Sequence, residues 1–66
     1  MRVTVNGKIR DVAPETTLAD LVAAFNLQPK HVAVEVNCDL VPRRNYPETR
    51  LNEDDRIEIV TLVGGG

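Results

Sequence analysis

The sequence predicts one α+β domain in which a mixed sheet of four to five strands packs on one amphipathic helix. Segments that favour β-structure occur at both ends and in the middle of the chain, and only one segment has the apolar spacing of a helix. The length of 66 residues suits a single domain. A domain this small has a stability of only about a few kcal/mol, which leaves little room for strained catalytic machinery and weighs against an enzyme.

The first twelve residues have the pattern of a β-hairpin. Residues 2–5 alternate apolar and polar side chains, Asn6-Gly7 supplies two residues that tolerate positive φ, and residues 8–12 resume an extended pattern. We therefore expect two antiparallel strands joined by a tight turn.

One helix follows the hairpin. Four apolar residues fall at positions i, i+3, i+4 and i+7 and share a helical face: Leu18, Leu21, Val22 and Phe25. Thr17 can cap the first turn, and Asp20 favours the positive end of the helix dipole. Asn26 is suited to the left-handed conformation that ends a helix, and Pro29 prevents continuation.

The middle of the chain predicts a strand and a short edge strand. Residues 32–36 alternate with one buried face, residues 37–39 form a polar turn, and residues 40–41 form the second strand. Pro42 cannot donate a hydrogen bond to a central ladder, so this strand is expected at an edge of the sheet.

The last third of the chain leads into the longest strand. Residues 46–51 are expected to form an irregular crossing that can include a helical turn, and residues 52–55 form a turn. Residues 56–63 are the longest β-favouring run and the predicted last strand. This order of elements fits a β-grasp fold, in which the last strand runs parallel to the first.

Composition and charge exclude several kinds of partner. The formal net charge is −2, and acidic and basic residues are interspersed without the basic stripe that nucleic-acid binding needs. Phe25 and Tyr46 are the only aromatic residues, so base stacking is not supported. The single Cys38 cannot form an internal disulfide, and no leader or membrane-spanning apolar run is present. We therefore expect a cytoplasmic protein without a membrane partner.

The last strand has apolar side chains on both faces. Ile57 and Ile59 share one face of the strand. The apolar residues that follow them fall on both faces, with Val60 and Leu62 on the opposite face and Val63 on the same face as the isoleucines. A bulge or a strand covered on both sides would explain this pattern. An exposed apolar patch that docks a protein partner explains it as well, and the glycines that follow favour the patch.

Residues 1–63 are predicted to form the domain, and Gly64, Gly65 and Gly66 a flexible tail. A glycine run at a chain end is often a frayed terminus. These glycines, however, have no side chains and would extend about 10 Å at roughly 3.3 Å per residue, so they can thread a narrow channel in another protein. The Gly66 carboxylate is ionised at neutral pH and can attack the α-phosphorus of a bound nucleotide. The resulting acyl adenylate can accept sulfur and become a thiocarboxylate.

Three segments resemble the thiamine-biosynthesis sulfur-carrier family: Leu40-Val41-Pro42-Arg43, residues 55–60 and Val63-Gly64-Gly65-Gly66. The resemblance covers essentially the whole chain, and the terminal motif is its most specific element. The chain departs from the family pattern in two turns, at residues 37–39 and 54–55, which alters loops and not the terminal chemistry.

The resemblance implies a ubiquitin-like fold and a protein that is not an enzyme but a co-substrate of partner enzymes. An adenylating enzyme of the ubiquitin-activating type would use ATP on Gly66, and a cysteine desulfurase route would supply sulfur. The thiocarboxylate would then donate sulfur to thiazole synthase. The carrier itself would bind no cofactor, and the residues expected to bind partners are Val60, Leu62, Val63 and Arg43.

Other residues with reactive or charged side chains have simpler interpretations. Cys38 lies in a predicted turn without a His or Lys to lower its pKa, and His31 has no second metal ligand at a suitable spacing. The acidic run 53–55 lacks the spacing of a calcium loop, so no metal site is expected. Arg43, Arg44 and Arg50 form a solvated face more readily than a basic patch for an acidic partner.

Three other functions remain compatible with the sequence. The small subunit of molybdopterin synthase uses the same terminal chemistry on a related fold, although this chain is shorter than typical members. A ubiquitin-like modifier would attach Gly66 to lysines of other proteins. A β-grasp binding module with an inert tail is the third alternative.

Overall fold

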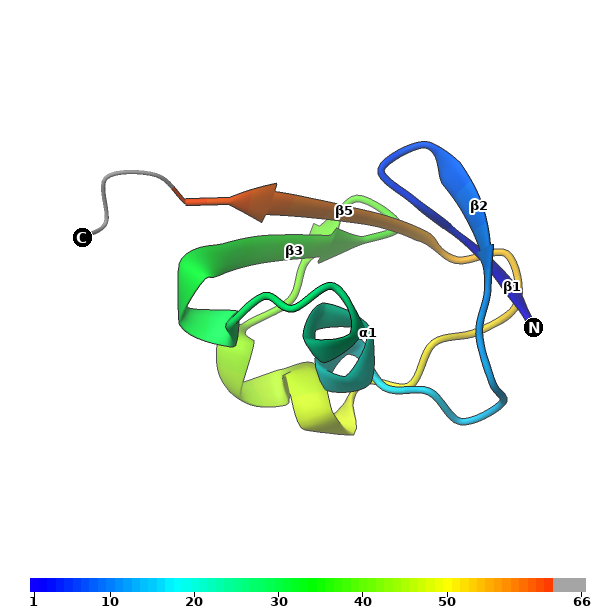
Figure 1. Cartoon of the computed structure of the whole chain (residues 1–66), viewed down its shortest axis with the longest axis horizontal. Helices are drawn as coiled ribbons and strands as arrows, with labels where there is room; N and C mark the ends of the chain where they lie inside the picture. The colour runs from blue at the N-terminus through cyan, green and yellow to red at the C-terminus, as the bar shows by residue number, and fades with distance from the viewer. Residues whose placement is uncertain (63–66) are drawn as a thin grey trace.

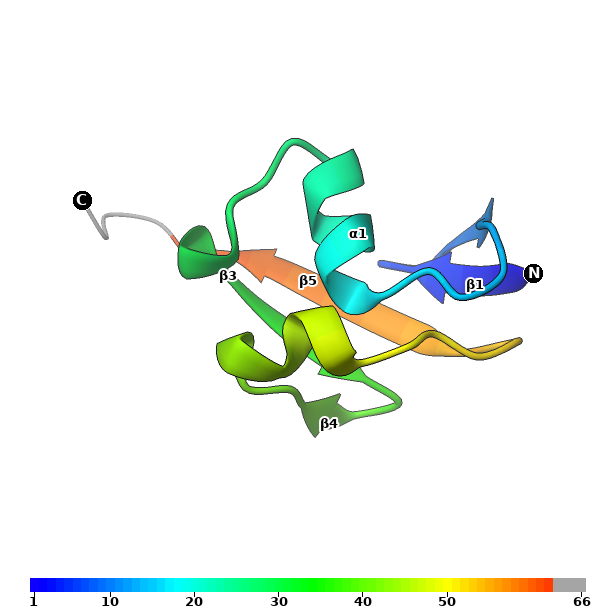
Figure 2. The ribbon, with the colours of Figure 1, turned by 90° about the horizontal axis from the view of Figure 1, so that it is seen from below.

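The computed structural model describes residues 1–62 and contains a five-stranded sheet in the order β2-β1-β5-β3-β4. The strands are β1 (Arg2–Val5), β2 (Lys8–Asp11), β3 (Val32–Val36), β4 (Asp39–Leu40) and β5 (Arg56–Thr61). The helices are α1 (Leu18–Ala24) and two 3₁₀ helices, η1 (Pro29–His31) and η2 (Arg43–Glu48). Figures 1 and 2 show α1 and η2 lying side by side on one face of the sheet.

β1 and β2 form the predicted hairpin. Asn6 and Gly7 have φ values of 50° and 83°, the positive values that a two-residue type I′ turn requires. β2 ends at Asp11, one residue before the predicted end, but Val12 still donates its amide hydrogen to the Met1 carbonyl at 2.8 Å. The hairpin is confirmed, with Val12 hydrogen-bonded just beyond the strand.

α1 begins at the predicted cap. The Thr17 hydroxyl accepts a hydrogen bond from the Asp20 amide at 3.1 Å, and the Asp20 carboxylate accepts one from the Thr17 amide at 3.0 Å. This reciprocal capping box satisfies two amide groups that the first helical turn leaves unpaired. Asn26 has the expected positive φ, 61°, just beyond the helix. Phe25 is half-buried, with the Arg10 guanidinium 4.6 Å from the centre of its ring.

β4 differs from the prediction by one residue. The expected turn over residues 37–39 is a two-residue turn in which Asn37 and Cys38 have φ values of 52° and 73°. Because the turn needs only these two residues, Asp39 already pairs with Val36, and β4 is Asp39–Leu40 instead of residues 40–41. β4 lies at an edge of the sheet, as Pro42 predicted.

β5 is shorter than predicted, and the crossing before it contains a longer helical turn. β5 ends at Thr61, and the Leu62 amide still donates to the His31 carbonyl at 2.8 Å, in the same register as the last pair of the ladder, Val32 and Thr61. Val63 and the predicted boundary between domain and tail lie outside the described residues. The helical turn expected within residues 46–51 is η2, which begins earlier, at Arg43.

β5 is the central strand and joins the two halves of the sheet. It is parallel to β1, with Val5 opposite Ile57, and antiparallel to β3, with Val34 opposite Ile59. This parallel contact between the first and last strands confirms the predicted β-grasp topology. Side chains from the sheet, α1, η2 and the crossing form one core: Val3, Val5, Leu18, Leu21, Val22, Val32, Val34, Tyr46, Leu51, Ile57 and Ile59.

Two asparagines in turns hold β5 from opposite sides. The Asn6 side chain donates to the Ile59 carbonyl at 3.1 Å and accepts from the Ile59 amide at 2.8 Å, so it acts as a further strand residue. The Asn37 side chain accepts from the Arg56 amide at 2.9 Å and donates to the carboxylate of buried Asp55 at 2.9 Å. These contacts fix the register of β5 on both of its edges.

Replacing Asn6 by glycine should lower the free energy of unfolding by about 1–3 kcal/mol, because two hydrogen bonds to β5 are lost at about 0.5–1.5 kcal/mol each. Glycine accepts the positive φ of this position, so the substitution removes the side chain without adding backbone strain. Urea denaturation followed by circular dichroism measures the change. Lys8→Ala, which removes an exposed side chain of the same hairpin, is the comparison and should cost much less. A loss below about 0.5 kcal/mol for Asn6→Gly would contradict a role in holding β5.

Candidate functional site

The predicted site is divided between described and undescribed residues. Val60 and Leu62 lie at the end of β5 and are 58% and 48% exposed, so these apolar side chains do face outward as expected. Val63, Gly64, Gly65 and Gly66 lie outside the described residues. The described part of the site is therefore the surface around the end of β5.

The exposed apolar side chains all lie on the face of the sheet that α1 and η2 leave open. Ile57 and Ile59 of β5 are buried, so the intervening Val60 points away from the helices, as does Ala33, its partner on β3. Leu40 shares this face because it pairs with Glu35 of β3. On β2, Ile9 pairs with Thr4 and reaches the same face. Among residues 1–62 the large apolar side chains with high exposure are Ile9, Leu40, Val60 and Leu62. We call this surface the open face.

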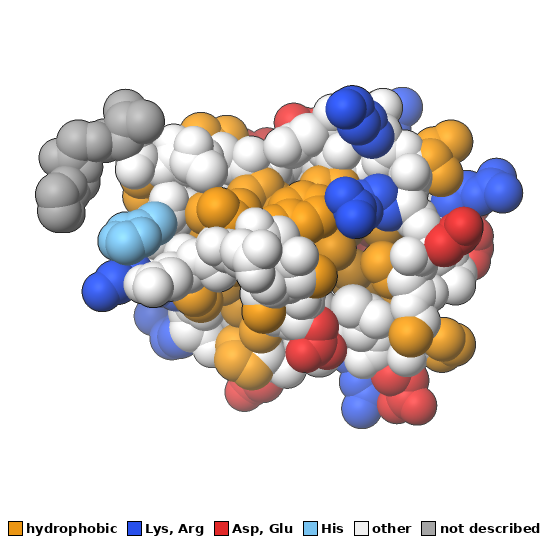
Figure 3. All heavy atoms as spheres, in the orientation of Figure 1, with side chains coloured by type: hydrophobic (Ala, Val, Ile, Leu, Met, Phe, Trp, Pro, Cys, Tyr) orange, Lys and Arg blue, Asp and Glu red, His pale blue; other side chains and the backbone are white. Residues whose placement is uncertain are grey.

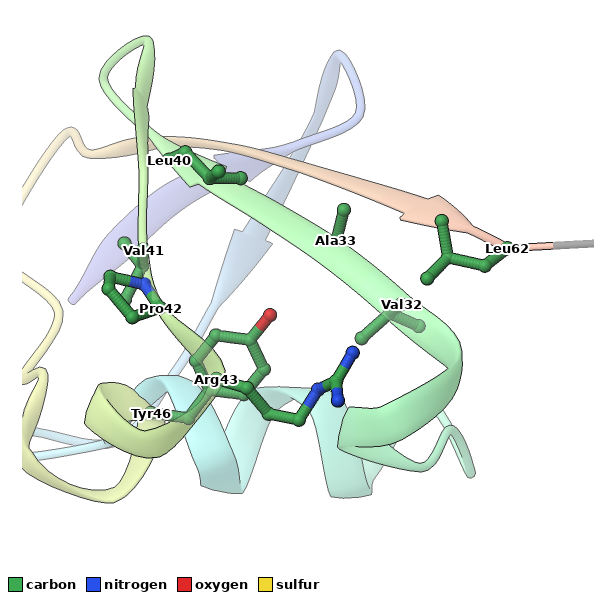
Figure 4. A pocket seen from close by; sticks show the side chains of 8 residues that line it. All are labelled: Val32, Ala33, Leu40, Val41, Pro42, Arg43, Tyr46 and Leu62. Carbon is green, nitrogen blue, oxygen red and sulfur yellow. The ribbon is translucent and has the colours of Figure 1, made fainter. Parts of the chain in front are cut away.

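A groove adjoins the open face at the edge of the sheet near the end of β5. It has a volume of about 180 Å³ and is lined by Val32, Ala33, Leu40, Val41, Pro42, Arg43, Tyr46 and Leu62. Figure 4 shows Arg43 extending from η2 across the groove toward Val32, while Leu62 reaches in from the end of β5. Two residues predicted to bind partners, Arg43 and Leu62, thus line the same groove although they are far apart in the sequence.

Basic side chains lie near this end of the molecule, as they do elsewhere on its surface (Figure 3). Lys30 and His31 lie in η1, whose His31 carbonyl accepts the hydrogen bond from Leu62. Figure 3 shows basic side chains and the histidine on the side where β5 ends. The Arg43 guanidinium adds to this charge at the groove.

Tyr46 forms the floor of the groove and belongs to the core. Its side chain is 2% exposed, and burial raises the pKa of its hydroxyl above the ordinary value of 10.0. The positive charge of Arg43 and a hydrogen bond with the Val34 backbone lower the pKa and only partly offset the effect of burial. Tyr46 therefore remains an uncharged phenol at neutral pH and serves as packing beneath Arg43.

The residues with simpler interpretations lie away from the groove or have structural roles. Cys38 is exposed in the turn before β4, and His31 is exposed in η1. Asp55, from the acidic turn, accepts hydrogen bonds from the Asn37 side chain and from the Asn52 amide at 2.7 Å. Within residues 1–62 no group of three or more potential metal ligands is present, and no helix is long and apolar enough to cross a membrane.

Sequence reasoning missed part of this surface. Leu40 and Ala33 join Val60 and Leu62 only through the pairing of β3 with β4 and β5. Ile9 lies on the same face through the pairing of β2 with β1. The available signal was the alternation within each strand, which marks Leu40 and Ile9 as outward-facing once the strand boundaries are known.

Comparison with known proteins gives one family. The model of the ThiS family matches residues 3–66. A relative named sulfur carrier protein ThiS, from Bacillus subtilis, is 41% identical over 63 residues, which are 94% of this chain and 96% of the relative. A crystal structure of a thiamine biosynthesis protein (ThiS) from Geobacter metallireducens superposes with a TM-score of 0.84 at 32% identity, covering 100% of both chains.

A relative of a different size is named thiazole synthase. The protein of that name from Magnetococcus marinus is 39% identical over 66 residues, which are 100% of this chain and 20% of the relative. This chain therefore spans a fifth of the length of that relative. A segment like this chain is part of the same polypeptide as the rest of that synthase.

Ionisation of Tyr46 should begin at a higher pH than in a model peptide, and the protein should lose stability as the pH rises above about 10. The folded state has the raised pKa, so above pH 10 the unfolded chain releases its phenolic proton first and is favoured. Ultraviolet titration gives a clean signal because Tyr46 is the only tyrosine and tryptophan is absent. In Tyr46→Phe the signal and this pH dependence should both vanish. A transition at or below pH 10 would contradict the burial of the hydroxyl.

Proposed function

The chain belongs to the ThiS family, and we propose that it is a sulfur carrier of thiamine biosynthesis and not an enzyme. The observation that carries the proposal is the match along nearly the whole length of the Bacillus subtilis sulfur carrier. The fold supports it, because the structure of the Geobacter metallireducens thiamine biosynthesis protein (ThiS) superposes over the whole of both chains. A small domain with its core filled by apolar side chains suits a carrier that partner enzymes recognise.

The reactive group in this proposal is the carboxylate of Gly66. One carboxylate oxygen attacks the α-phosphorus of ATP in the site of an adenylating enzyme, and pyrophosphate leaves. A sulfur nucleophile, delivered at the oxidation level of sulfide or of a persulfide with a reducing thiol, then attacks the carbonyl carbon, and AMP leaves. The product is a Gly66 thiocarboxylate. ATP and the sulfur donor, from a cysteine desulfurase route, are used by partner enzymes, and the carrier binds no cofactor of its own.

The proposed acceptor of the sulfur is thiazole synthase. The Magnetococcus marinus relative with that name contains a segment similar to this whole chain, which supports a close working relation between the two proteins. A role in this cytoplasmic, ATP-dependent pathway agrees with the single Cys38, which is exposed.

The open face and the groove are the proposed docking surfaces. Exposed apolar side chains beside the end of β5 exclude water from a partner contact at the point where the tail must enter an active site. Arg43 adds a cation at the groove that can pair with a carboxylate of the partner. Tight docking here positions the glycine tail and lets the partner enzyme supply the catalytic groups.

Gly66 should be essential for activation and dispensable for folding. After incubation with the adenylating enzyme, ATP and the sulfur donor, intact mass spectrometry should show one oxygen of the wild-type terminus replaced by sulfur. Deleting Gly66, or adding one residue after it, should abolish this change and leave thermal unfolding nearly the same. Persistence of the mass change in the deletion variant would refute the carrier chemistry, and isopeptide-linked adducts on lysines would instead favour a protein modifier.

Val60→Asp and Leu62→Asp should each weaken docking to the adenylating enzyme about tenfold or more, because a charge enters an apolar contact. Isothermal titration calorimetry with the purified enzyme measures the affinity. Thr61→Asp is the matched control, because Thr61 is exposed in the same strand but pairs with Val32 and therefore lies on the opposite face. If both variants bound as tightly as Thr61→Asp, the apolar surface would not be a docking site.

A further inference from the structure

Two glutamates lie directly opposite each other on the open face. Glu35 of β3 pairs with Glu58 of β5 in the antiparallel register, so both side chains project from the same face of the sheet. Both are exposed. Residues in this arrangement have Cβ atoms about 4.5–5.5 Å apart.

This arrangement is unfavourable for the free domain. Like charges directly opposite on adjacent strands destabilise a sheet. Arg56 lies on the same face, two residues before Glu58, but it does not form an ion pair with it. Within residues 1–62 the ion pair present joins Arg50 to Glu15, away from the sheet. The two negative charges of Glu35 and Glu58 are therefore left to solvent.

Apolar side chains surround the two carboxylates. Leu40 pairs with Glu35 on one side, and the next pair of β3 and β5 on the same face is Ala33 and Val60. A partner that covers Leu40 and Val60 also covers the space between them, where the glutamates lie. Burying two like charges without a cation is costly, so a tightly docked partner must bring positive charge to this point.

We propose that the open face docks on thiazole synthase by receiving an arginine or lysine side chain between Glu35 and Glu58, with apolar residues of the synthase against Leu40 and Val60. This inference rests on the proposed function and adds the chemistry of the partner surface. The cation neutralises both carboxylates, and the apolar contacts around it exclude water and strengthen the pairing.

Charge complementarity selects a protein partner over other occupants, and thiazole synthase is the protein chosen because the Magnetococcus marinus relative of that name carries a segment like this chain in one polypeptide. A second copy docked through the same face would bring Glu35 and Glu58 near their own counterparts, because a twofold contact is made by the same surface on both subunits. Anionic lipid headgroups and nucleic-acid phosphates are repelled by the same two carboxylates. A protein surface with a basic residue among apolar ones satisfies both features of the open face.

The test measures binding of the full-length carrier to purified thiazole synthase from the source organism by calorimetry. The double variant Glu35→Gln/Glu58→Gln should bind at least tenfold more weakly, and Glu35→Lys/Glu58→Lys should bind more weakly still. The thermal midpoint of the Gln variant should be equal to or higher than that of the wild type, because the repulsion is gone. Raising the salt concentration should weaken the wild type more than the Gln variant.

Glu48→Lys is the matched control, because Glu48 is an exposed glutamate at the end of η2 on the helix side of the sheet. It should change the affinity less than twofold. Wild-type affinity in the Gln variant would overturn the inference, as would a loss of affinity accompanied by a lower thermal midpoint, which indicates a structural role. Either result leaves the proposed function intact if Gly66 still gains sulfur, whereas absence of that mass change would refute the function itself.

Discussion

The backbone of β5 needs hydrogen-bond partners on both sides, and the rest of the architecture follows from that requirement. The strand obtains them from β1 and β3, which lie in distant parts of the chain. Where β1 ends, the Asn6 amide continues the pairing with Ile59, and Asn37 holds Arg56 from the other side. The strand is thereby hydrogen-bonded along both edges, by its neighbouring strands and by the two asparagine side chains.

A single short helix covers only one face of this sheet. α1 and η2 bury the side chains that β1, β3 and β5 direct toward them, and Tyr46 closes the core beneath Arg43. The other face has no covering layer within the described chain (Figure 1), yet it carries Ile9, Leu40 and Val60. A small domain seldom exposes so many large apolar residues on one face without a binding partner. One face of the sheet thus supplies the core, and the other is the proposed docking surface.

Charged side chains are distributed unevenly over the open face, the groove and the end of β5. Glu35 and Glu58 lie within the sheet surface, whereas Arg43 lies at the groove and Lys30 near the end of β5. A partner surface with matching charges can bind in one orientation only, because a rotated partner would place like charges together. Such an arrangement agrees with the proposed role of a carrier that docks on a partner enzyme.

The sequence by itself determined the local elements and the family. The Asn6-Gly7 turn, the Thr17 cap and the apolar spacing of the helix depend on neighbouring residues, so their positions were predicted within about a residue. The end of β5 and the start of η2 were not, because they depend on contacts with distant parts of the chain. The turn before β4 was missed although it is local, because Asn37 and Cys38 adopt positive φ without a glycine. Only the tertiary structure decided that Arg43 and Leu62 share a groove and that Glu35 faces Glu58, because strand register, which no local pattern specifies, brings these residues together.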